Sequence, residues 1–271
     1  MNDIITRTHC RAGGGKLINL LNLGEIHLNG FPLPDEPDPP KFPLILAIGE
    51  HSGLLQLRHT INPELMYRDY WYESSTNESM VAHLKHVAGS VYDYCVMVPG
   101  DSILDIGCND GTLLANFDDG QYDTVGVDPS NVTPPDIDEF YNNFFSASMF
   151  IDRKFKAIFS IAMFYDLDDP VQFSKDVASI LENDGVWVIE MHYAPKMLEM
   201  NDIGAICHEH LCYYSFETLR YVLDQAGLYI CDAKMNEVNG GSIRVYVKKL
   251  LPHEKYLDEN GITRFDTRVD M

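Results

Sequence analysis

Positive charge is scarce in this 271-residue chain, which has 20 lysines and arginines against 41 aspartates and glutamates and a formal charge of -21. So large an acidic excess repels phosphate backbones, which argues against nucleic acid as a partner. Long hydrophobic runs are missing too, since no stretch approaches the roughly 18 apolar residues of a membrane-spanning helix. The N-terminus also lacks an apolar segment behind a positive one. We therefore expect a cytoplasmic protein with no membrane partner.

Cysteine is sparse, and its distribution does not suggest a disulfide framework. The six cysteines are scattered and lie mostly inside apolar segments, as reduced, buried thiols do, so we expect no disulfides. With 45% hydrophobic and 11% aromatic residues, the chain can bury a substantial core. Its length fits one catalytic domain and a smaller appendage.

The first part of the chain, residues 1–68, is irregular. It has glycines at 13–15 and a proline-rich bend at 31–43, followed by the apolar run LILAI and the strand-like run LLQLRHTI. Glycine and proline interrupt regular elements, and short apolar runs between them are typical of strands. We predict a small β-rich or loop-rich module that packs against something larger.

A main domain is predicted over residues 69–250, introduced by a helical segment at 67–95. The tail, 251–271, is polar and charged and has no core-forming pattern. The apolar stripe of the helical segment consists of Met80, Leu84, Val87 and Val91.

Strands and helices alternate along this main domain. SILDIG, TVGVD (124–128), AIFSIAMFY (157–165) and VWVIEM have the pattern of buried strands, while TLLANF opens a helix and DDPVQFSKDVASILENDG (168–185) forms another. Such alternation predicts an α/β fold with a parallel, doubly wound, Rossmann-like sheet. LYICDAKM and SIRVYVKK (242–249), separated by EVNGG, predict an antiparallel end to that sheet.

The loop in ILDIGCNDGTLL has no glycine at position 109 and no Gly-Lys-Ser/Thr after it. These absences exclude the dinucleotide fingerprint, whose first two glycines are two apart, and the phosphate-binding P-loop. What remains is Asp105 at the end of the strand, Gly107 and Gly111, and Asp128 ending the next strand, where a doubly wound sheet meets a ribose. Asp105 would complement a cationic amino acid moiety. The predicted ligand is an adenosine with positive charge and no phosphate, S-adenosylmethionine, with Asn109 as a further contact.

The motifs ILDIGCNDGTLL and GVDPS resemble those of class I S-adenosylmethionine-dependent methyltransferases. Other segments resemble the sugar C-methyltransferase family, which methylates carbon 3 of nucleotide-linked 4-keto deoxysugars: YRDYWYESSTNESMVAHL, SIAMFYDLDDPVQF, GVWVIEMHY, ICHEHLCYYS and VNGGSIRVYV. The likeness runs in order from about residue 10 to residue 249. It implies a small-molecule substrate, a sugar nucleotide.

The resemblance also implies catalytic residues. The family's base, the second histidine of His-Glu-His, maps onto His210, its neighbouring glutamate onto Glu209, and a tyrosine facing the sugar onto Tyr72. Carbon methylation needs a base that removes a proton beside a carbonyl, and groups that stabilise the enolate; a histidine pKa near neutrality suits the first task. A packing role is at least as good an interpretation for His208, Tyr70, Tyr213 and Tyr214.

Metal binding is the rival interpretation of CHEHLC, because four of its six residues, Cys207, His208, His210 and Cys212, are possible zinc ligands. Ligands crowded into six residues do not converge easily on one tetrahedral ion, since neighbouring side chains point apart. We therefore favour catalysis over metal binding here, and predict no metal site.

The zinc module with which the family normally opens is degraded in this chain. Of four cysteine ligands only Cys10 remains, with Gly13, Gly49 and Ser52 at the other positions. His9 and His51 are close enough in sequence to compensate, but loss of zinc is the simpler interpretation. Apolar packing would then hold the module together, through Leu44, Leu46, Leu54, Leu55 and Leu57.

Other departures from the family leave the acceptor open. Cys207 and Asp166 stand where some members have a tyrosine and a histidine, and the family usually has another α/β domain after VNGGSIRVYV. A partner chain or a homo-oligomer could supply that part. O- or N-methylation of a small acceptor, and a non-catalytic subunit that keeps the cofactor fold, are the competing functions.

Overall fold

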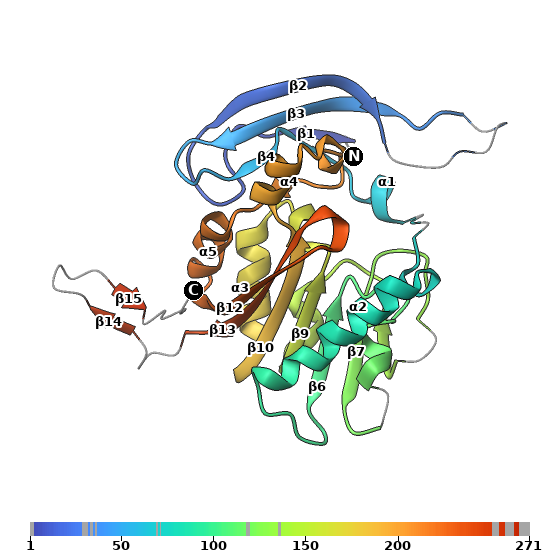
Figure 1. Cartoon of the computed structure of the whole chain (residues 1–271), viewed down its shortest axis with the longest axis vertical. Helices are drawn as coiled ribbons and strands as arrows, with labels where there is room; N and C mark the ends of the chain where they lie inside the picture. Colours follow the sequence, from blue (N-terminus) through green and yellow to red (C-terminus); the bar gives the residue numbers. More distant parts are fainter. Residues whose placement is uncertain are drawn as a thin grey trace.

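The larger part of the molecule is an α/β unit, and a smaller sheet lies across one end of it (Figure 1). The structure is a computed structural model that describes residues 3–28, 32, 35, 37–68, 70, 72–117, 120–134 and 137–250, with the backbone of 255–257 and 263–265. The predicted polar tail therefore lies mostly outside the described residues, apart from the paired strands β14 (Lys255–Leu257) and β15 (Thr263–Phe265).

The described residues of the α/β unit form a seven-stranded sheet in the order β12-β13-β10-β9-β6-β7-β8. Five neighbouring strands, from β10 to β8, are parallel, and β13 and β12 complete the sheet in antiparallel fashion. The predicted Rossmann-like fold is thus confirmed, antiparallel end included. Its strands are β6 (Ser102–Ile106), β7 (Asp123–Val127), β8 (Glu139–Tyr141), β9 (Phe155–Ile161), β10 (Leu181–His192), β12 (Leu228–Asn236) and β13 (Ser242–Lys249).

The order in which the chain adds strands to this sheet reverses between β6 and β9, although the two strands are parallel. From β6 the chain moves outward to β7 and β8, and it then returns to place β9 and β10 on the other side of β6. The loops that leave the carboxyl ends of β6 and β9 therefore diverge. A crevice at such a switch point is where doubly wound sheets bind their ligands.

Helices cover both faces of the sheet, which explains why its central strands are apolar almost throughout. On one face α2 (Glu78–Gly89) packs over Ile103 and Phe159. On the other, α3 (Pro170–Ile180) and α5 (Phe216–Asp224) pack over Leu104 and Ile158. Alternate residues of each strand thus face opposite layers, as the pleat requires.

The predicted helical segment at 67–95 is helical only in part. A single turn, α1 (Glu64–Tyr67), precedes it, and α2 begins at Glu78 because the Asn77 side chain accepts the backbone N–H of Ser79 at 3.0 Å. The predicted apolar stripe does face the core, where Leu84, Val87 and Val91 are buried. Residues 72–76, predicted as helix, instead lie against the loop that follows β6.

Three other predicted boundaries were wrong. TLLANF forms only the 3-10 turn Leu114–Phe117, and β9 ends at Ile161 because Ala162 adopts a left-handed φ of 54°. The helix predicted to 185 ends at Ile180, and Asp184 and Gly185 lie in β10. Close packing requires that glycine, since a Cβ there would lie 2.8 Å from the Lys156 carbonyl oxygen.

The N-terminal region forms a four-stranded antiparallel sheet in the order β11-β4-β3-β2. Three of these strands precede residue 68, but β11 (Cys212–Tyr213) belongs to the His-Glu-His segment, so the main domain completes the sheet of the module. The other strands of the region are β1 (Ile4–Thr6), β2 (Leu17–His27), β3 (Lys41–Gly49), β4 (Leu55–Leu57) and β5 (His59–Ile61), with β1 paired to β5.

A leucine cluster and a small polar cluster hold the module together. Leu44, Leu46, Leu54 and Leu57 are buried as predicted, and Leu55 is half-buried. The Cys10 Sγ lies 3.1 Å from the Ser52 Oγ and accepts a hydrogen bond from the Gln56 side chain at 2.9 Å. A Cβ on Gly49 would lie 2.6 Å from both the Cys10 and Ser52 side chains, so these positions converge in space.

Neither metal clusters nor membrane helices are found in the described part of the chain. Histidine, cysteine, aspartate and glutamate side chains do not gather there in threes with a geometry that could hold a metal ion. No helix among the described residues is both long enough and apolar enough to cross a lipid bilayer. All six cysteines are free thiols.

Candidate active site

The loop after β6 is shaped by two glycines. Gly107 and Gly111 both have a φ of 79°, in the left-handed region that disfavours other residues. A Cβ on Gly107 would lie 3.1 Å from Met163 Cγ, and one on Gly111 would lie 2.9 Å from Pro134 Cβ. The spacing that suggested a ligand loop therefore corresponds to two positions that need glycine for conformation and for space.

Two aspartates flank this loop at the ends of neighbouring strands. Asp105, in β6, is buried and its Oδ1 has no hydrogen-bond partner among the described residues. Burial first, and then the nearby Asp128 carboxylate, raise the pKa of Asp105 to about 8. Asp128, just after β7, accepts the backbone N–H of Asn109 at 2.9 Å and that of Ser130 at 2.8 Å. The structure thus brings the predicted cofactor residues into one cluster.

Asn109 joins the loop to the segment that precedes α2. Its φ of 49° is left-handed, its side-chain amide donates to the Tyr72 carbonyl at 2.9 Å, and its Oδ1 accepts the Ser74 N–H at 3.0 Å. The neighbouring Asp110 accepts the Ser75 N–H at 2.7 Å. Residues 72–76 are thereby bound over the glycine loop.

A cavity of about 470 Å³ opens beside these contacts. It is bounded by the glycine loop, the segment before α2 and the chain after β7. Its walls consist of Glu73, Ser75, Asp110, Gly111, Thr112, Ala115, Asn131, Val132 and Thr133. This cavity borders the Asp128 side of the loop.

His210 lies in the second part of the site, with its tautomer fixed by the backbone. The Nδ1 atom is 2.9 Å from the Ala205 carbonyl oxygen, which can only accept, so Nδ1 carries the proton and Nε2 keeps its lone pair. Burial lowers the pKa of His210 below its ordinary value, which favours the neutral ring. The Tyr165 ring packs against it with centroids 4.4 Å apart.

An acidic pair consists of Asp166, which follows Tyr165 in the sequence, and Glu209, which precedes His210. Burial, and then the Glu209 carboxylate, raise the pKa of Asp166 well above its ordinary value, while a hydrogen bond with Tyr67 offsets part of that rise. The Asp166 Oδ1 is buried and has no hydrogen-bond partner among the described residues. Tyr67 also donates to the Glu209 carbonyl oxygen at 3.3 Å. Asp166 is therefore a neutral acid next to a carboxylate.

Residues 80–233, more than half of the chain, match the family model described as a methyltransferase domain. The chain belongs to this family. It has an S-adenosylmethionine-dependent methyltransferase domain, as its loop motifs predicted.

Relatives of this methyltransferase agree with that assignment. It is 26% identical over 260 residues to the C-methyltransferase NovU of Streptomyces niveus, covering 91% of this chain and 62% of that protein, so it spans less than two thirds of that relative's length. Among solved structures, a putative methyltransferase in complex with the Haloferax volcanii Trm112 methyltransferase activator has a TM-score of 0.51 at 17% identity, covering 65% of this chain and 94% of that chain. That likeness shows the fold.

The residues of the methyltransferase fit its cofactor. Asp128 follows β7, and each of its carboxylate oxygens accepts one described hydrogen bond and keeps a lone pair for a second, as ribose hydroxyls require. Asp105, whose buried Oδ1 has no hydrogen-bond partner among the described residues, suits a cationic group, and Gly107 allows the left-handed turn of the loop that follows it. Both glycines and both acids predicted from the sequence could thus hold the cofactor.

The two tyrosines of YWYESS occupy different surroundings in the methyltransferase. Tyr72 shares a hydrogen bond with Ser74 and lies near Asp110, on the cofactor loop. Burial, and then the acidic groups of Asp166 and Glu209, raise the pKa of Tyr70 to about 12, which places Tyr70 beside the acidic pair. Tyr70, for which a packing role was an equal alternative, is therefore the one of these two tyrosines that lies near Asp166 and Glu209.

His208 has a structural position. Its Nε2 donates to the Phe42 carbonyl oxygen at 3.2 Å, which ties the His-Glu-His segment to β3. Two residues that the sequence did not single out also border the site. The His192 ring lies 6.4 Å from that of His210, with its Nε2 3.6 Å from an Asp202 oxygen. His192 ends β10 and Asp202 lies in the chain that follows, and these positions were the signal in the sequence.

Proposed function

We propose that this methyltransferase transfers a methyl group to a carbon atom next to the carbonyl group of a nucleotide-linked keto deoxysugar. The observation that carries the proposal is the neutral His210 ring, whose Nδ1–H is held by a backbone carbonyl while Nε2 stays free to accept a proton. The 26% identity to a C-methyltransferase supports the same reaction class.

The first step is removal of a proton from carbon. Nε2 of His210 takes the proton, and the electron pair of the broken C–H bond moves to the carbonyl oxygen to form an enolate. Because burial lowers the pKa of His210 below its ordinary value of 6.5, the ring is ready to accept a proton at neutral pH. Packing of Tyr165 against the imidazole holds it in one orientation.

Groups that could donate hydrogen bonds to an enolate oxygen lie near Glu209, the residue before His210. Asp166 keeps its proton because of burial and the Glu209 charge, and Tyr70 stays protonated for the same reasons. Such neutral donors stabilise developing negative charge without leaving a cation buried when the site is empty. Glu209 orients Asp166 and Tyr70. Tyr72 reaches the substrate from the segment before α2, which lies over the cofactor loop.

The cofactor, when bound by Asp105, Asp128 and the glycine loop, supplies an activated methyl group on a sulfonium. The enolate carbon would receive that methyl group, and the proton that the carbon lost stays on Nε2 of His210. The work left to the protein is positioning and exclusion of water.

Deuterium exchange tests the base separately from methyl transfer. The protein, loaded with S-adenosylhomocysteine so that no methyl is available, is incubated in D₂O with a thymidine diphosphate-linked 4-keto deoxysugar. Proton NMR should show exchange of the hydrogen next to the carbonyl. His210→Asn should reduce that exchange at least 100-fold while the affinity for S-adenosylhomocysteine stays within threefold of wild type.

The matched control is His51→Asn, since His51 is exposed and lies in the N-terminal module. It should retain full exchange. With ¹³C-methyl-labelled cofactor, a new methyl carbon bonded to a ring carbon supports the proposal. A label on oxygen or nitrogen would show O- or N-methylation in place of the proposed carbon methylation. Full exchange in His210→Asn would show that another group is the base.

A further inference from the structure

Two chain segments form the walls of the candidate catalytic site, and both touch the N-terminal module. One wall follows β9 and carries Tyr165 and Asp166; the other is the segment from Cys207 to Tyr213 that carries His210. Neither segment is a long regular helix or strand. The relative position of Tyr165 and His210 therefore depends on what holds these two segments from outside.

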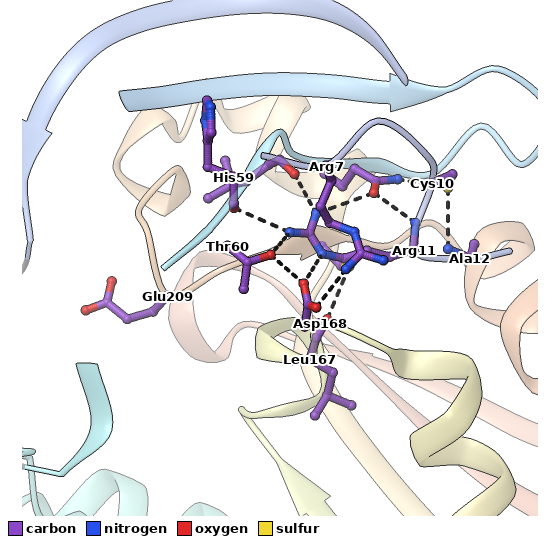
Figure 2. Close-up of polar contacts among 12 residues, drawn as sticks. Arg7, Cys10, Arg11, Ala12, His59, Thr60, Leu167, Asp168 and Glu209 are labelled. Carbon is purple, nitrogen blue, oxygen red and sulfur yellow. Dashed lines mark hydrogen bonds and ion pairs between the residues drawn. The ribbon is translucent and has the colours of Figure 1, made fainter. Parts of the chain in front are cut away.

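The first wall is held at Asp168, two residues after Asp166. Arg7 donates to the Asp168 Oδ2 at 2.7 Å, and Arg11 donates through Nε to Oδ1 at 3.3 Å. Thr60 also donates to Oδ1. Figure 2 shows the Asp168 carboxylate reaching up from the main domain into this group, with the arginines above it.

Arg11 is fixed in turn by the strands of the module. Its side chain is fully buried, and its NH2 donates to the Thr60 Oγ1 at 2.7 Å and to the His59 carbonyl oxygen at 3.3 Å. The Arg11 backbone N–H donates to the Gln56 side-chain oxygen at 3.0 Å. A guanidinium with this many partners cannot shift without breaking several of them, so it presents Nε to Asp168 in one position.

The second wall is held by the same strands. Cys212 and Tyr213 pair with Gln56 and Leu55 of β4, and the Leu57 N–H donates to the Leu211 carbonyl at 2.9 Å. His208 is tied to the Phe42 carbonyl on β3 at 3.2 Å. Gln56 thus contacts Arg11 on one side and the His210 segment on the other.

We propose that the N-terminal module is the positioning frame of the catalytic site, and that the Arg7–Arg11–Asp168 cluster sets the Tyr165 ring against His210. This inference rests on the proposed role of His210 as the base. The module would then act in catalysis without touching the substrate. It would fix both walls to β4 and β5, two short strands that follow each other in the sequence. Arg7, Arg11 and Asp168 are positioning residues.

Arg7→Gln is the variant that tests the frame with least risk to folding. The Arg7 side chain is 25% exposed and makes its described ion pair with Asp168 alone. The matched control is Arg153→Gln, because Arg153 is 23% exposed and likewise pairs with carboxylates, those of Asp123 and Glu139, far from His210 in the sheet. Asp168→Asn serves as the second variant, since it removes both ion pairs and keeps an acceptor for Arg11.

Two readouts need no acceptor substrate. In ¹³C-histidine NMR titrations, with the His210 signal assigned through His210→Asn, the midpoint of His210 should rise by at least 0.5 pH units in Arg7→Gln and Asp168→Asn and stay unchanged in Arg153→Gln. Hydrogen exchange should quicken at least tenfold at residues 163–168 and 208–213 while the amides of β6 and β7 keep wild-type protection. Affinity for S-adenosylhomocysteine should not change.

Deuterium exchange into the keto sugar supplies the catalytic readout. We expect a decrease of about tenfold in the maximal rate for Arg7→Gln and Asp168→Asn, with little change in the concentration for half-maximal rate. Unchanged His210 titration and local protection in both variants would overturn the inference, as would a uniform loss of protection across the sheet. If wild type itself exchanged no substrate hydrogen while the NMR shifts occurred, the proposed acceptor would be wrong and the frame would stand.

Discussion

Replacing Asp105 with asparagine should stabilise the protein in the absence of cofactor and weaken cofactor binding at the same time. Burial, and then Asp128, raise the pKa of Asp105 from its ordinary 3.8 to about 8. In the unfolded chain the carboxyl group loses its proton near pH 4, whereas the folded chain keeps it up to about pH 8. Stability from this group is therefore complete below pH 3.8 and is lost as the pH rises through 8.

The size of the effect follows from the proton that the folded state retains. Between pH 3.8 and about pH 8 the wild-type protein loses about 1.4 kcal/mol of stability per pH unit relative to a variant whose residue 105 does not titrate. Between pH 5 and pH 7, Asp105→Asn should therefore gain roughly 3 kcal/mol on the wild-type protein. Urea unfolding curves at pH 5, 7 and 9, followed by tryptophan fluorescence, measure this difference. Parallel pH profiles for the two proteins would refute the reasoning.

Cofactor binding supplies the second half of the prediction. A cationic group next to Asp105 favours its ionised form, so binding at pH 7 should release a proton, detected by calorimetry in buffers of different ionisation enthalpy. Asparagine cannot form that ion pair, and we expect a loss of 10- to 100-fold in affinity, as for a charge-assisted hydrogen bond of about 1.5–3 kcal/mol. Equal affinity in the variant, without proton release in wild type, would place Asp105 outside the cofactor site.

Three other predictions concern separate features. Gly111→Ala should lower the free energy of unfolding by roughly 2 kcal/mol, measured by thermal unfolding, because φ is 79° and the new Cβ would lie 2.9 Å from Pro134 Cβ. Gly100→Ala is the control, because Gly100 is also left-handed but has open space around it, so this variant reports the conformational strain without the crowding. Glu190→Gln should cost roughly 3 kcal/mol because Arg244, 2% exposed, loses its ion pair at 2.6 Å. Burial alone would raise the pKa of Glu190, but His83 and Arg244 lower it below 4.5. The stability that ionised Glu190 contributes to the wild-type protein is therefore present above pH 4.5 and is lost as the pH falls. The variant should not show this loss of stability in acid. Tyr70→Phe should slow substrate deuterium exchange more than Tyr72→Phe does, because Tyr70 lies beside Asp166 and Glu209; the reverse order would favour the tyrosine on the cofactor loop.

The cofactor loop was predictable because the sequence encodes it locally. Asp105 and Asp128 end two strands that the apolar runs SILDIG and TVGVD mark out, and parallel neighbouring strands bring such ends together. Gly107 and Gly111 mark a turn because their φ values exclude other residues. Each of these inferences depends on residues that lie within a few positions of one another.

The features that prediction missed depend on distant parts of the chain. Asp168 and Arg11 are separated by 157 positions, and nothing around either residue indicates the other. Residues 72–76 have helical spacing, but the Asn109 side chain binds their backbone outside the helix. Strand β9 ends at Ile161 because the next residue, Ala162, is left-handed, and nothing in the sequence indicates this. The tautomer of His210 likewise depends on a carbonyl group that only the fold places nearby.

Gly49 constrains how this module can change over generations. A Cβ at that position would meet the Cys10 and Ser52 side chains at 2.6 Å, so any single substitution there is blocked until one of its neighbours becomes smaller or moves. Positions 10, 49 and 52 should therefore change together in related sequences, although Cys10 and Ser52 are 42 residues apart. A side chain at position 49 is therefore expected only in sequences where position 10 or position 52 has also changed.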